Sequence, residues 1–284
     1  MKGERFPYAI MLRVGLDRDL GGIWAPLLDI GEPDEKRRFE YVPFPHWRTK
    51  TTTGSKPESE LMKYGVRLKT YRDISGINYP DKKLSDFLPE DEIRYYQESW
   101  SPPKDVVPHN DPNFLYATYG DYWRSNEGGR LPAVWKSFNP EDEDLWIFFV
   151  ERLAPFVDKS DFKTITRLQR KTNGVYIVGA MLVAEFIDIS VTGWESALTS
   201  HNRNKSTIVE NFHFRRRKDE PVIIRGIPNK TRLFPKALPL NYRIDGRTGV
   251  TEAGKLLGVT EKDQVRFKYI YDSGIVAKLL DKLN

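Results

Sequence analysis

The stretch Val106–Asp121, VVPHNDPNFLYATYGD, carries the residue types most suited to chemistry. Pro108 and Pro112 restrict the residues before them to extended backbone, so His109 and Asp111 are expected on a stiff, non-helical loop. An imidazole near a carboxylate combines a group that titrates near neutral pH with one that stays anionic, which suits acid/base or metal chemistry. A structural alternative stays open, because Asn-Asp-Pro is also a turn signal in which Asp111 would hydrogen-bond the following backbone.

A second candidate cluster follows the first predicted strand, Tyr8–Arg13. Arg13 and Asp17 come at the end of that strand, and Gly21 and Gly22 follow closely. Paired glycines let the backbone approach a ligand or present N–H groups to a phosphate. The segment lacks the Gly-Lys-Ser/Thr ending and the GxGxxG spacing of phosphate loops, so a simple tight turn is the alternative.

Basic residues provide further candidate contacts for an anionic substrate. Glu151–Lys171, predicted as a loop between two core strands, holds six basic and three acidic residues and includes Arg167 and Arg170. The densest basic run, Arg215–Lys218, comes soon after His213. We therefore take Asp121, Arg167, Arg170, His213 and Arg215 as substrate-binding candidates together with Arg13, Gly21 and Gly22, the alternative being solvated surface loops.

Composition limits the class of protein. The 284 residues are 30% charged and 13% aromatic, and no apolar run reaches the roughly 18 residues that span a bilayer. We expect a soluble, cytoplasmic protein without a membrane partner. Cysteine is absent, so any metal must bind through His, Asp or Glu, and the sequence assigns no cofactor. The net charge of +5 suits an anionic partner, although many charged residues would equally suit surface ion-pair networks of a heat-adapted protein.

Apolar, β-rich segments predict the elements that position these residues. The expected sheet strands are Tyr8–Arg13, Phe39–Phe44, Asp144–Val150, Gly174–Val191 with a bend near Gly179, and Pro221–Arg225. Gly226–Pro239 is interpreted as a turn-rich return, and Thr251–Leu283 as two short helices with Thr251 as N-cap and Gly258 as a stop. This pattern predicts one α+β domain over residues 1–284, with a mixed, mostly antiparallel sheet, open or barrel-like, and peripheral helices.

Three of these segments, in this order, resemble the nucleotide modification associated domain of the third type. They are LRVGLDRDLGG, HNDPNF with the later YGD, and the pair DLWIFF and GVYIVGAMLV. The matching positions are Arg13, Gly15, Asp17, Gly21, Gly22, Pro26, His109, Asp111, Pro112 and Gly120. The chain departs from the family where Glu143-Asp144 replaces Gly-Asp, and the basic element around His213 matches only loosely. The resemblance implies an association with the modification of bases in DNA or nucleotides. It does not imply a particular reaction.

Two functions compete on these observations. The first is an enzyme that modifies a nucleotide or a nucleic-acid base, with His109 as general acid/base, Asp17 and Asp111 as carboxylates and Arg13 on the phosphate. The second is a non-catalytic reader of modified nucleic acid with a β-barrel-like pocket, in which Trp47, Trp100 or Trp123 stacks on a flipped base.

A metal-dependent nuclease is a third hypothesis. It would use Asp17, Asp111 and Asp121, or Glu185 and Asp188, but their spacing matches no nuclease motif. Alternating acids such as Glu185 are more typical of the solvent face of a strand.

Overall fold

The computed structural model of the chain describes residues 6–14, 25–28, 38–43, 69–88, 108, 111–121, 137–156, 167–168, 170–193, 196–197, 222–261 and 267–283. Its strands are β1 (Ala9–Arg13), β2 (Ala25–Leu27), β3 (Thr118–Asp121), β4 (Trp146–Pro155), β5 (Asn173–Asp188), β6 (Val222–Gly226), β7 (Arg232–Ile244), β8 (Arg247–Val250) and β9 (Phe267–Ile270). Its helices are the 3-10 turns η3 (Leu84–Phe87) and η7 (Pro228–Lys230) and the α-helices α4 (Ile189–Thr192), α8 (Glu252–Leu256) and α9 (Ser273–Leu283).

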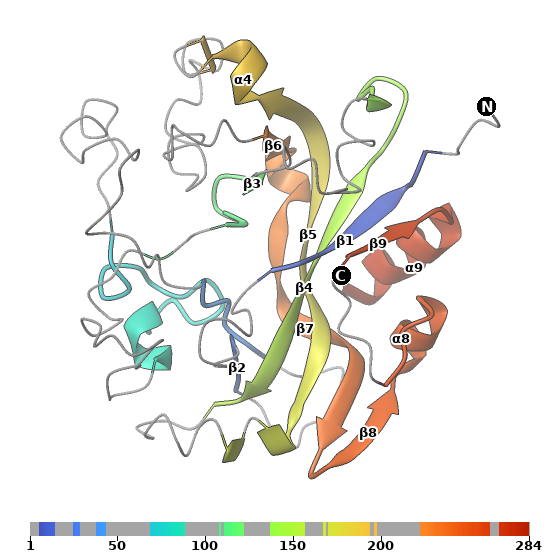
Figure 1. The fold of residues 1–284 in the computed structure, drawn as a ribbon. Helices are drawn as coiled ribbons and strands as arrows, with labels where there is room; N and C mark the ends of the chain where they lie inside the picture. The colour runs from blue at the N-terminus through green and yellow to red at the C-terminus, as the bar shows by residue number, and fades with distance from the viewer. Residues whose placement is uncertain are drawn as a thin grey trace.

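The described strands form one open sheet whose main path runs β3-β6-β5-β4-β1-β9 (Figure 1). The long strand β5 lies at its centre and pairs with β4, β6 and β7. β1 and β2 run parallel to β4, whereas all other pairs in the described sheet are antiparallel. The predicted α+β class with a mixed, mostly antiparallel sheet is confirmed, and the sheet is open rather than a barrel.

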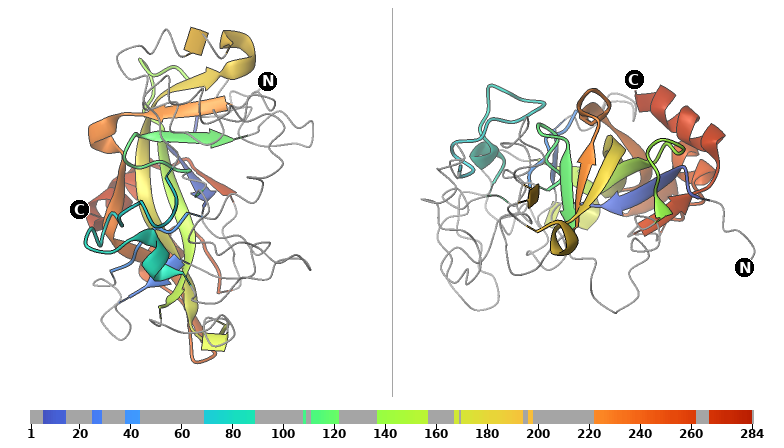
Figure 2. Two further views of the ribbon diagram at one scale, coloured as in Figure 1. Left: turned by 90° about the vertical axis from the view of Figure 1, so that its left-hand side faces the viewer. Right: turned by 90° about the horizontal axis from the view of Figure 1, so that it is seen from above.

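The sheet carries a hydrophobic core on each face. Side chains alternate along β4, so that Ile147 and Phe149 join one core while Phe148 and Val150 join the other. Helices α8 and α9 cover the second face with apolar residues such as Leu279 (Figures 1 and 2). Irregular segments cover the first face, with Phe39, Tyr41, Phe114 and Tyr119. Irregular segments therefore form much of the described part of the face that carries the loop of residues 111–121, here called the central loop.

Four of the five predicted strands are present with shifted ends. β4 continues to Pro155, so Glu151 and Arg152 lie within a strand and not in a basic loop as predicted. β5 ends at Asp188, where the carboxylate accepts a hydrogen bond from Ser190 N and caps α4. A register shift against β7 lies at Ile177–Gly179, where a bend was expected.

Two predicted elements were wrong. Residues 40–43 of the expected strand Phe39–Phe44 form no ladder, and Arg38, just before it, forms an isolated bridge to Lys236. Gly226–Pro239 is not a turn-rich return, because it contains the first part of β7. Pro235 and Pro239 suggested loop, but both lie at register shifts of the β5–β7 pairing, where missing N–H groups are tolerated.

The end of the chain follows its local signals. The Thr251 hydroxyl accepts a hydrogen bond from Gly254 N and caps α8, and Gly258 has φ +64° just beyond this helix, so both predictions are confirmed. The sequence did not predict β9, which lies between α8 and α9 in the chain. This strand pairs with β1. In the described part of the chain, no helix has the length and apolar character needed to cross a membrane.

The buried carboxylate of Glu40 fixes the irregular segment 69–88 to the sheet. Its oxygens accept hydrogen bonds from four backbone N–H groups, those of Tyr41, Ile77, Asn78 and Tyr79, each at 3.0 Å. Burial raises the pKa of Glu40, and these N–H donors oppose the rise. The Asn78 side chain adds bonds to the carbonyl oxygens of Phe39 and Phe234. The hydrogen bonds of this one side chain thus take the place of the ladder hydrogen bonds that residues 40–43 lack.

Glu40→Gln should lower the free energy of unfolding by about 2–3 kcal/mol, because an amide NH₂ would face N–H donors that a carboxylate accepts. Chemical denaturation measures the change. Glu252→Gln, at a carboxylate whose side chain is 89% exposed, is the control and should leave stability unchanged. A Glu40→Gln protein as stable as the control would contradict this role.

Gly179→Ala should destabilise the protein by about 1–3 kcal/mol. A Cβ at this position would overlap the Phe114 ring and lie 2.8 Å from the Arg232 carbonyl oxygen. The comparison is Gly246→Ala, where a Cβ meets nothing within 4 Å and only the positive φ opposes alanine. Thermal unfolding should show the larger loss for Gly179→Ala, and the opposite ranking would disprove close packing at β5.

Candidate functional site

Glu151 is a buried carboxyl group on the face of β4 that the irregular segments cover. It is 1% exposed, and neither of its oxygens has a hydrogen-bond partner in the part of the chain that is described. Burial raises the pKa of Glu151 well above its usual value, while the nearby Arg13 guanidinium lowers it in part. Buried polar groups are almost always hydrogen-bonded, so this carboxyl calls for a functional explanation.

Arg13 is the cation whose charge acts on Glu151. It ends β1, and its register partner on β4 is Val150, the residue before Glu151. Arg152 is half-buried, and burial lowers its pKa, with the positive charge of Arg13 lowering it further. Side-chain alternation places Arg13 and Arg152 on the face of Val150, opposite Glu151, so Arg13 acts on the carboxyl only through its charge. Two neighbouring guanidinium groups favour the binding of an anion.

Tyr41 connects Glu151 to the central loop. Its hydroxyl donates a hydrogen bond to the Asp111 carbonyl oxygen at 3.1 Å. Burial raises the pKa of Tyr41 well above its usual value, and the charges of Glu151 and Asp111 raise it further. The phenol is therefore a neutral hydrogen-bonding group within electrostatic range of both acids.

Asp111 is buried and holds the turn that follows it. Its Oδ1 atom accepts a hydrogen bond from Gly120 N at 2.9 Å, across a loop closed by paired backbone bonds between Asn113 and Thr118. The peptide bond between Asp111 and Pro112 is cis. The capping role that the Asn-Asp-Pro signal offered as an alternative is therefore realised in this side chain.

Phe114 fixes this loop to the sheet. Its ring lies against Gly179 of β5 and meets Tyr41 and Phe149 edge to face, with ring centroids 5.4 Å apart in both pairs. The loop thus carries Asp111 to Tyr41, and Tyr41 lies near Glu151. Of the predicted residues, Asp111 belongs to this cluster, together with Tyr41 and Glu151, which the sequence did not single out. Arg13 lies on the opposite face of the sheet, within electrostatic range of Glu151.

The remaining candidates lie either outside the described residues or elsewhere in the fold. His109, Asp17, Gly21, Gly22, His213 and Arg215 lie outside the described residues, as do Trp47, Trp100 and Trp123. Asp121 ends β3, and its side chain is likewise not described. Arg167 and Arg170 are exposed and come shortly before the start of β5. Glu185 pairs with Arg225, and Asp188 caps α4, so neither acid forms a metal site.

Sequence reasoning missed Glu151 because it follows a run of apolar residues and begins a charged stretch. The signal that could have identified it is its place in an apolar pattern. Glu151 alternates with Phe149 and Leu153, both fully buried, so a strand continued through this position turns its carboxyl into the core.

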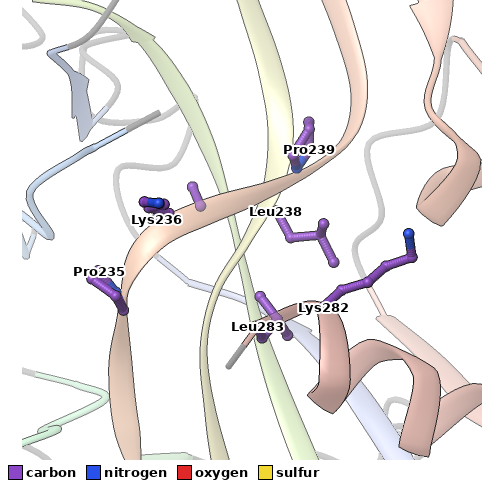
Figure 3. A pocket seen from close by; sticks show the side chains of 7 residues that line it. Pro235, Lys236, Leu238, Pro239, Lys282 and Leu283 are labelled. Atoms are coloured by element: carbon purple, nitrogen blue, oxygen red, sulfur yellow. The ribbon is translucent and has the colours of Figure 1, made fainter. Parts of the chain in front are cut away.

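A shallow hollow of about 370 Å³ lies on the other face of the sheet, between β7 and the end of α9 (Figure 3). Leu238 and Leu283 line it, and both belong to the core that α8 and α9 cover. Lys236 and Lys282 also line it, and Lys282 bonds Glu252 at 3.4 Å. It has no part in the Glu151 cluster.

Among the described residues, no group of three or more His, Asp or Glu side chains could hold a metal ion. Comparison with known protein families, with curated proteins and with solved structures found no match to this chain. The resemblance to the nucleotide modification associated domain stays a prediction.

The pH dependence of stability tests the state of Glu151. Its raised pKa means that, above its ordinary value of 4.5, the unfolded chain loses the proton while the folded protein keeps it. Stability should therefore fall as pH rises, until pH reaches the folded-state pKa. Glu151→Gln mimics the protonated acid at every pH. It should match the parent protein near about pH 4 and be more stable near about pH 8, by about 1.4 kcal/mol for each unit of pKa difference.

Chemical denaturation at the two pH values measures this difference, with Glu252→Gln as the exposed control. If Glu151→Gln instead lowers the free energy of unfolding at about pH 8, the Glu151 carboxyl stabilises the fold. It would then play the same part as Glu40.

Proposed function

We propose that this protein is an enzyme that modifies a nucleotide or a nucleic-acid base, preferably in DNA, and that Glu151 is its proton-transfer group. The observation that supports the proposal is the buried Glu151 carboxyl, which has no hydrogen-bond partner among the described residues and lies near Arg13 and Tyr41. A carboxyl with a raised pKa gives or takes a proton near neutral pH, which suits general acid/base catalysis. The net charge of +5 and the family resemblance support the substrate class.

Each neighbour of Glu151 has a role in this proposal. Arg13 and Arg152 attract a phosphate or another anionic group of the substrate. Tyr41, held by the Asp111 carbonyl, offers a neutral hydroxyl that orients the substrate beside the acid. His109, two residues before Asp111, stays a candidate for a second general acid/base.

Analysis of cellular DNA tests the reaction, because the host cell supplies the common co-substrates of base modification. The protein is expressed in bacteria, and the DNA is digested to nucleosides and examined by mass spectrometry. We expect a new nucleoside with the parent protein, none with Glu151→Gln, and an unchanged yield with Glu252→Gln. The loss should exceed about 100-fold, the usual contribution of a positioned acid or base.

Native mass spectrometry of the purified protein tests binding separately. A retained nucleotide should survive in Glu151→Gln and be lost in Arg13→Gln, and the exposed Arg38→Gln is the matched control. A retained nucleotide without any modified nucleoside would favour the non-catalytic reader. If the purified protein retains no nucleotide and no modified nucleoside is found, the proposed function is contradicted.

A further inference from the structure

Five exposed cations gather at the end of the sheet where β4 leads into β5 and β7 turns into β8. They are Arg167, Arg170, Lys171, Arg243 and Arg247, here called the basic tip. The first three were visible in the sequence as part of one basic segment. Arg243 and Arg247 lie more than seventy positions later, and only the fold brings them to the same place.

Two backbone contacts join the halves of the basic tip. Gly246 N donates a hydrogen bond to the Lys171 carbonyl oxygen at 3.3 Å, and Asp245 N donates to Thr172 Oγ1 at 3.4 Å. Strand pairing places Arg243 opposite Asn173. The helical residues around Lys171 and the β7–β8 hairpin consequently lie side by side at one end of the molecule (Figures 1 and 2).

The tight hairpin turn between β7 and β8 directs Arg243 and Arg247 to opposite sides. Asp245 and Gly246 both have positive φ, 48° and 85°, as a two-residue hairpin turn requires. Arg243 pairs with Thr248, whereas Arg247 pairs with Ile244, so the two guanidinium groups leave opposite faces of the ribbon. Arg167, Arg170 and Lys171 are spaced three and four residues apart on helical backbone, which places them on one side of it.

The charges of the basic tip are not neutralised by the described part of the chain. None of its five cations makes an ion pair with a described residue. The described acids at this end are Asp245 and Glu261, and Glu261 accepts a hydrogen bond from Thr248 at 2.7 Å. Five positive and two negative side chains leave +3, more than half of the net charge of the whole chain. Exposed, uncompensated cations of this density attract a polyanion.

We propose that the basic tip binds the phosphate backbone of a nucleic-acid strand. Four of its five cations are arginines, whose planar guanidinium groups bind phosphate oxygens in pairs. The inference rests on the proposed function and names its substrate class as a polynucleotide, not a free nucleotide. Tyr176 pairs with Glu151, and Asn173, three residues along β5, pairs with Arg243. That step is about 10 Å at about 3.3 Å per residue, so the basic tip begins a short distance along β5 from the register position of Glu151.

Fluorescence anisotropy with labelled 20-nucleotide single-stranded and duplex DNA tests the inference. The variant R167Q/R243Q/R247Q removes three charges from the basic tip. The matched variant K230Q/K255Q/K278Q removes three exposed charges elsewhere. At about 50 mM salt, we expect the first variant to bind at least about tenfold more weakly than the parent, and the second to bind within about threefold of it. The slope of log affinity against log salt should shrink by about 2–3 in the first variant only, because each lost phosphate contact removes about 0.9.

Equal weakening in both triple variants, or no weakening in the first, would overturn the inference. Binding to phosphatidylserine vesicles that depends on the basic tip, with DNA binding unaffected by it, would overturn it in favour of a membrane surface. Glu151→Gln should bind DNA as tightly as the parent. If the basic tip fails this test while Glu151→Gln still abolishes the modified nucleoside, the proposed function stands. If DNA binding depends on the basic tip and no nucleoside is modified, only the proposed function falls.

Discussion

Gly179 lies near the middle of β5, and its missing side chain leaves room for the Phe114 ring to lie directly against the strand. The loop that carries Phe114 also carries Asp111, whose carbonyl holds the Tyr41 hydroxyl near Glu151. Helices α8 and α9 cover the other face, whereas on this face an aromatic contact with a glycine holds an irregular loop against the sheet. The geometry of the candidate site depends on that close approach.

Two buried glutamates show how partners decide the role of one side chain. Glu40 accepts hydrogen bonds from four backbone N–H groups and joins the irregular segment 69–88 to the sheet. Glu151 is equally buried, yet it has no hydrogen-bond partner among the described residues and has an arginine nearby. The first arrangement stabilises a fold. The second costs stability, which is typical of a group retained for chemistry.

The long strand β5 also relates the two regions that we connect to function. Its pairing with β4 passes Glu151, and its first residue pairs with β7 beside the basic tip. Both regions therefore belong to one rigid element, a few residues apart. A substrate that extends beyond a single nucleotide would use this arrangement, because its charged backbone and its reacting base need separate supports.

Elements with local signals could be predicted from the sequence. Apolar β-branched runs predicted β1, β4, β5 and β6, and the Thr251 cap and the Gly258 stop predicted the limits of α8, because hydrogen bonds and dihedral preferences act within a few residues. The two prolines concealed β7, since their tolerance depends on register shifts against β5. The burial of Glu151, the hydrogen bonds of Glu40 to residues 77–79 and the position of Arg243 near Arg167 could not be predicted in this way. Burial and the convergence of charges depend on contacts between residues far apart in the chain, which no local pattern encodes.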